Sequence, residues 1–129
     1  MRIELIHPIA AHFAIGLSVT SVLVLIVGGL GRWNWWLRAG QLMLWLGAAA
    51  IIVAAIFGDV ASDRIPKTAA LDQLIDTHCT LGIISACLIV AAAVGWAIIA
   101  AGKWPRLKIW MQLLGAAGLI MIVITGFYG

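Results

Sequence analysis

Two histidines occur in the same local context, and they are the residues of this sequence best suited to hold a cofactor. Gly16 follows His12 by four residues, and Gly82 follows His78 by four residues. Because residues four apart share one face of a helix, each glycine would leave space beside an imidazole for the edge of a porphyrin. Two imidazoles on opposite sides of one iron make a low-spin haem b site. The pair predicts such a site.

His7 and Asp59 allow a second kind of site. Together with His12 and His78 they would form a mononuclear centre for zinc, copper or iron, since imidazole and carboxylate suit these metals. His7 could equally cap a helix, and Asp59 could form an ion pair with Arg64 or Lys67. The same two basic residues could instead neutralise haem propionates. No residue is assigned a catalytic role.

The composition indicates which elements must position these side chains. Of the 129 residues, 64% are hydrophobic and 10% are charged, and the mean hydropathy is +1.14. Soluble domains carry about 25% charged residues, so this chain predicts an integral membrane protein in contact with the lipid bilayer. The net charge of +3 comes from short loops between apolar segments. It therefore does not suggest a nucleic-acid partner.

Four apolar segments are long enough to cross a bilayer. They cover about residues 9–30, 39–60, 77–101 and 108–128. His7 is expected at the cap of the first helix, with Pro8 in its first turn, and Asp76 or Thr77 at the cap of the third. The segment 61–76 is expected to be a loop with at most a short amphipathic turn.

The distribution of charge predicts the orientation. The loops around residues 32–38 and 103–108 contain five basic residues and no acidic ones, whereas all five acidic residues lie toward the other side. Basic loops stay in the cytoplasm. Both termini are therefore expected in the periplasm of a bacterial inner membrane.

The second half of the sequence partly repeats the first. Residues 46–52 resemble residues 114–120 at a spacing of 68, and the two His-x-x-x-Gly motifs are 66 residues apart. We therefore expect one domain, 1–129, an all-α up-down four-helix bundle made of two parallel helical-hairpin repeats at about 9–60 and 75–128. In such a bundle the first and third helices are parallel and diagonal, which would bring His12 and His78 to one depth.

Three motifs carry a resemblance to a known family. They are the segment His7-Pro8-Ile9-Ala10-Ala11-His12-Phe13, the pair Gly58-Asp59 and the triplet Asp76-Thr77-His78. In these the chain resembles an uncharacterised bacterial four-helix transmembrane family, a domain of unknown function, and more distantly the four-helix b-type cytochromes. Ala14 departs from the proline that many relatives have there. The resemblance implies four helices with a histidine site near the outer surface.

These observations favour a membrane-embedded b-type haem protein that transfers electrons at the periplasmic side, with a quinone or a redox protein as partner. Two hypotheses remain beside it. One is the mononuclear metal site, and the other is an accessory subunit of a larger membrane complex whose histidines bind nothing. The chain could also associate with copies of itself.

Overall fold

The computed structural model describes residues 5–31, 33–63 and 68–128. These residues form four long α-helices and one short 3-10 helix, without any strand. The helices are α1 (Ile6–Gly31), α2 (Asn34–Ser62), α3 (Ala69–Ala100) and α4 (Lys108–Phe127), and η2 (Pro105–Leu107) precedes α4. The predicted all-α class is confirmed.

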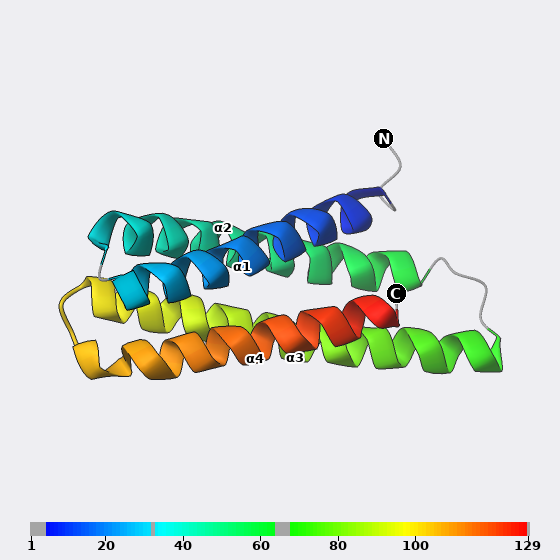
Figure 1. Ribbon diagram of the computed structural model, residues 1–129. Helices are drawn as coiled ribbons and strands as arrows, with labels where there is room; N and C mark the ends of the chain where they lie inside the picture. Colours follow the sequence, from blue (N-terminus) through cyan, green and yellow to red (C-terminus); the bar gives the residue numbers. More distant parts are fainter. Residues whose placement is uncertain (1–4, 32, 64–67, 129) are drawn as a thin grey trace.

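The helices run up and down in two antiparallel hairpins (Figure 1). The packing is most extensive between α1 and α2, less so between α3 and α4 and between α2 and α3, and weakest among these neighbouring pairs between α1 and α4. α1 and α3 are therefore parallel and diagonal to each other. The start of α1, the end of α2, the start of α3 and the end of α4 all lie at one end of the bundle, which we call the histidine end.

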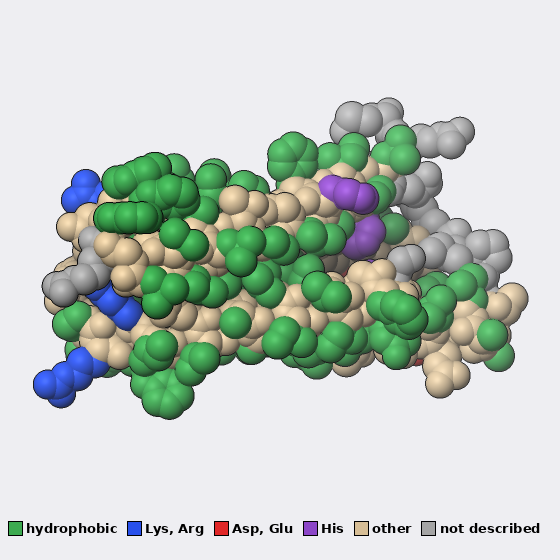
Figure 2. Space-filling view, in the orientation of Figure 1, with side chains coloured by type: hydrophobic (Ala, Val, Ile, Leu, Met, Phe, Trp, Pro, Cys, Tyr) green, Lys and Arg blue, Asp and Glu red, His purple; other side chains and the backbone are tan. Residues whose placement is uncertain are grey.

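All four helices are long and apolar enough to cross a membrane. Large hydrophobic side chains cover the outside of the bundle: Leu30 is 82% exposed, Trp110 63% and Phe127 86%. Figure 2 shows this apolar surface along the sides, with Lys and Arg side chains at the end opposite the histidines. Soluble proteins rarely expose so much contiguous apolar surface, so the outside of the bundle contacts lipid.

Small residues allow the helices of each hairpin to approach closely. A Cβ atom on Gly47 would lie 2.9 Å from Ser18 Oγ and 3.2 Å from the Ser18 backbone nitrogen, and one on Gly118 would lie 2.7 Å from Ile89 Cδ1. Such contacts are how membrane helices gain van der Waals energy, because lipid removes the hydrophobic driving force between them.

Two predicted helix starts are wrong, that of the third helix and that of the second. α3 begins at Ala69, eight residues before the predicted Thr77, and Thr68 occupies its N-cap position. The acidic residues of this segment suggested a loop, but Asp72 lies in the first turn of α3, where the helix dipole favours a negative charge. A helix can continue past the bilayer into water, so acidic residues do not end it. α2 likewise begins at Asn34, within the segment expected to be a tryptophan-rich loop.

The first helix also begins earlier than predicted. α1 starts at Ile6, so His7 lies within its first turn and is not its cap. Trp96 is 1% exposed and lies in the core. By contrast, the described side chains of Trp33, Trp35, Trp45, Trp104 and Trp110 are exposed.

Buried residues of the first hairpin match buried residues of the second hairpin that lie 71 positions later in the sequence. The sequence motifs had suggested a spacing of 66 or 68. Every buried residue of α1 has a buried counterpart in α3, and three buried residues of α2 have one in α4. Clear pairs are Ser18 and Ile89, Leu25 and Trp96, Gly47 and Gly118, and Ile51 and Ile122. At this spacing His78 corresponds to His7, and His12 corresponds to Ile83.

Candidate functional site

The structure brings His7 and His78 together at the histidine end. Their ring centroids are 6.3 Å apart, and the ring planes make an angle of 80°. The two side chains are half-buried and come from the diagonal helices α1 and α3. His7, treated above as one of several candidates, is thus the residue that faces His78.

Each histidine is oriented by a backbone carbonyl of the second helix in its own hairpin. His7 Nδ1 lies 2.7 Å from the carbonyl oxygen of Ala54, and His78 Nδ1 lies 3.1 Å from that of Thr125. In both cases the carbonyl comes 47 residues after the histidine. A carbonyl oxygen can only accept, so both Nδ1 atoms donate, and in the neutral imidazole Nε2 then keeps a free lone pair. Histidine ligands of metals commonly have this arrangement.

The surroundings of the two rings differ. A Cβ on Gly58 of α2 would lie 2.9 Å from both Cε1 and Nδ1 of His7, so only glycine lets that ring lie against the helix. Beside His78, the Thr125 hydroxyl donates to the carbonyl of Met121 at 2.7 Å and lies 3.1 Å from Ser85 Oγ. The Ser85 side chain is 1% exposed, which makes this a buried polar contact between α3 and α4.

His12 does not have the position predicted for it. It lies five residues after His7, which turns it about 140° around α1, and its side chain is exposed. Its Nδ1 lies 2.6 Å from the carbonyl oxygen of Pro8 in the same helix. The expectation that His12 and His78 face each other is therefore corrected: the repeat spacing of 66 on which it depended is not the spacing of equivalent positions in the structure.

The other predicted site residues are dispersed. Gly16 is exposed and has open space around it, while a Cβ on Gly82 would be 3.8 Å from Thr125 Cγ2, an ordinary contact. Asp59 is exposed on α2. In residues 5–31, 33–63 and 68–128, no three His, Cys, Asp or Glu side chains are grouped so that they could hold a metal ion. Arg64 and Lys67 lie outside the described residues.

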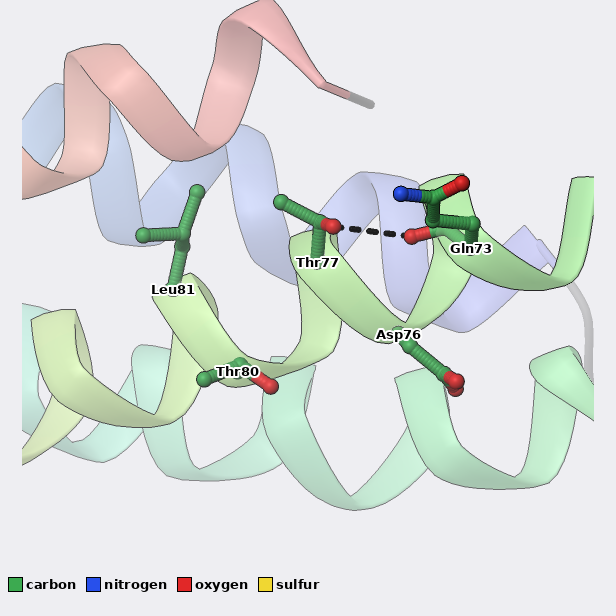
Figure 3. A pocket seen from close by; sticks show the side chains of 5 residues that line it. All are labelled: Gln73, Asp76, Thr77, Thr80 and Leu81. Atoms are coloured by element: carbon green, nitrogen blue, oxygen red, sulfur yellow. Dashed lines mark hydrogen bonds between the residues drawn. The ribbon is translucent and has the colours of Figure 1, made fainter. Parts of the chain in front are cut away.

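A shallow polar hollow lies on α3 just before and after His78. Figure 3 shows the five side chains that line it: Gln73, Asp76, Thr77, Thr80 and Leu81. The Thr77 hydroxyl donates to the carbonyl of Gln73 at 2.8 Å. The Asp76 carboxylate points away from this hydrogen bond (Figure 3). All five come from one helix, so this hollow is an open surface at the polar edge of the bundle.

Comparison with known proteins assigns a family but no activity. A family model described as "Predicted membrane protein (DUF2231)" matches residues 4–129. Searches of the curated proteins and of the solved structures gave no match.

Proposed function

The chain belongs to the DUF2231 family of predicted membrane proteins, and we propose that it is a membrane-embedded b-type haem protein whose iron is held by His7 and His78. Ionisable residues within a membrane protein that face its interior commonly mark functional sites. Here both histidines carry their proton on Nδ1 and keep Nε2 free. Iron, when bound, would supply one-electron redox chemistry between the two imidazoles.

The separation of the two rings is the observation that carries this proposal. With iron–nitrogen bonds of about 2 Å, two imidazoles on opposite sides of one metal have ring centroids about 6 Å apart, whereas a tetrahedral ion would bring them to about 5 Å. The observed 6.3 Å is compatible with two imidazoles that would hold one metal from opposite sides. A tetrahedral site also needs further protein ligands, and the described residues offer no group of three.

The fit of a porphyrin depends on the space between the hairpins. Neither of the two hollows described is lined by His7 or His78, so other side chains between the hairpins would have to move to admit a haem while the two rings keep their separation. Of the neighbouring helix pairs, α1 and α4 pack least extensively, and they diverge toward the histidine end in Figure 1. Arg64 and Lys67 follow α2 closely in the sequence, and we propose them as partners of the propionates.

Electron transfer is the activity that suits this site. Two imidazole ligands leave iron without an open position, which disfavours oxygen binding and suits transfer of single electrons. The electron partner is proposed to be a quinone or a redox protein at the same side of the bilayer.

The absorption spectrum of the purified protein tests the proposal. Protein produced with added haem precursor and purified in detergent should show a Soret band and, after reduction, a sharp α band, with about one haem per chain for a single bis-histidine site. A colourless protein that also fails to bind added haemin would overturn it, and would favour an accessory subunit with structural histidines.

The membrane orientation provides a separate prediction. We propose that the histidine end faces the periplasm of a bacterial inner membrane, because the described basic residues Arg38, Lys103, Arg106 and Lys108 lie at the opposite end and basic loops stay in the cytoplasm. Alkaline phosphatase fused after Tyr128 should be active, and a fusion after Asn34 inactive. The opposite pattern would place the histidine end in the cytoplasm.

A further inference from the structure

A second hollow lies on the outer face of the α1–α2 hairpin, where His12 is the main polar side chain. Its volume is about 450 Å³, and it is as open to the surroundings as the hollow on α3. It is lined by His12, Phe13, Gly16, Leu17, Thr20 and Met43. Because the exposed faces of these helices meet lipid, a ligand would enter it from the bilayer.

The floor of this hollow is a stripe of one helix with a polar group at each end. His12, Gly16 and Thr20 are four residues apart and therefore share a face of α1, and all three are exposed. A Cβ on Gly16 would meet nothing within 4 Å. The glycine thus leaves a gap between an imidazole and a hydroxyl group that a flat ring can occupy.

The proton position on His12 determines what it can recognise. Its Nδ1 lies 2.6 Å from the carbonyl oxygen of Pro8, which can only accept, so Nδ1 donates and Nε2 is left as an acceptor. The hydroxyl of Thr20 can donate or accept. A matching ligand offers a hydroxyl group to His12, a flat apolar ring over Gly16, and a second oxygen to Thr20.

We infer that this hollow binds the head group of a para-hydroquinone with an apolar tail, that is, a quinol of the membrane pool. The rise from His12 to Thr20 along α1 is about 12 Å. A hydroquinone ring with an oxygen at each end can lie along this stripe, with one oxygen toward His12 and the other toward Thr20. The apolar walls and the open side toward lipid accommodate the tail.

This inference goes beyond the haem proposal and does not need it. The hollow and the His7–His78 pair share no residue, so quinol binding remains if the pair holds nothing. An acyl chain of a phospholipid could also lie in an apolar groove. It would gain nothing from the imidazole or the hydroxyl group, and the experiment below separates the two occupants.

Binding of decylubiquinol provides the test. The full-length protein, in nanodiscs of saturated phosphatidylcholine, would be titrated with decylubiquinol under anaerobic conditions, and the haem spectrum would be recorded in the same samples. We expect saturable binding of one molecule per chain. His12→Phe and Thr20→Val should each weaken it about tenfold, as expected for loss of one hydrogen bond. Gly16→Leu should abolish it by filling the gap.

The matched control is Gly126→Leu. Like Gly16, Gly126 is an exposed glycine in a helix, and a Cβ added there would meet nothing within 4 Å. It should bind decylubiquinol like the unchanged protein. Absence of saturable binding would overturn the inference, as would unchanged binding in Gly16→Leu. Equal competition by decylbenzene, which has the tail but no hydroxyl groups, would show that the hollow takes acyl chains only. Binding that persists in His7→Ala, whose haem spectrum is expected to be lost, would separate the two sites.

Discussion

His7→Ala and His78→Ala are each expected to lose bound haem, whereas His12→Ala should retain it. Each of the first two changes removes one axial ligand and leaves the other imidazole alone. Replacing residues that merely support a metal ligand lowers affinity by about 10- to 100-fold, so removing the ligand itself should cost at least about 100-fold. The measurement is the haem content and the low-spin spectrum of each purified variant.

The His12 variant is the matched control for this prediction. It removes the same kind of side chain from the same helix, five residues away, where the ring is exposed and bonded to Pro8. Loss of haem in His12→Ala together with retention in His7→Ala would contradict the site proposed here. That result would restore the pairing of His12 with His78 that the sequence motifs suggested.

Gly58→Leu should lower haem affinity by about 10- to 100-fold although it removes no ligand. A Cβ at this position would lie 2.9 Å from Nδ1 and Cε1 of His7, so the ring must move and its hydrogen bond to the Ala54 carbonyl must break or lengthen. Haemin titration of the purified variant measures the effect, and circular dichroism checks that the helices are intact.

Gly16→Leu is the control for this change. Gly16 has open space around it, so the larger side chain should leave haem binding unaltered. Equal haem affinity in the unchanged protein and in Gly58→Leu would mean that His7 does not ligate iron from the position described.

Much of the fold was predictable because the bilayer imposes strong constraints on a sequence. Four apolar segments of sufficient length predict four helices, and their short connections predict an up-down order. Helix ends were predicted less well. The acidic residues before Asp76 indicate where the chain meets water, but they do not indicate that the helix stops there.

The pair of histidines that meet in the structure, His7 and His78, were both candidates from the sequence, but His12 was the favoured partner of His78. The error came from aligning the halves on a short His-x-x-x-Gly motif. A spacing of 71 aligns Gly31-Arg32-Trp33 with Gly102-Lys103-Trp104, and Gln41-Leu42 with Gln112-Leu113. It also aligns His7 with His78. These matches involve polar and aromatic residues, which recur by chance less often than Ala and Leu in an apolar sequence.

Other parts of the site leave no signal in residue types. The partners of the two imidazoles are the backbone carbonyls of Ala54 and Thr125, and any residue can supply a carbonyl. Which histidine faces inward depends on how each helix is rotated about its axis. Packing sets that rotation, through contacts such as Gly47 with Ser18, and the residue spacing along one helix does not reveal it.

Each hairpin orients its own histidine, since His7 bonds only within the first hairpin and His78 only within the second among the hydrogen bonds described. The cofactor site proposed here is thus divided into two equivalent halves, one in each repeat. A single hairpin that paired with a copy of itself about a twofold axis would present two identical histidines in the same way. Fusion of two such hairpins into one chain frees each half to change independently. The two halves already differ in one contact, because the positions equivalent to Thr125 and Ser85 are Ala54 and Ala14 in the first hairpin.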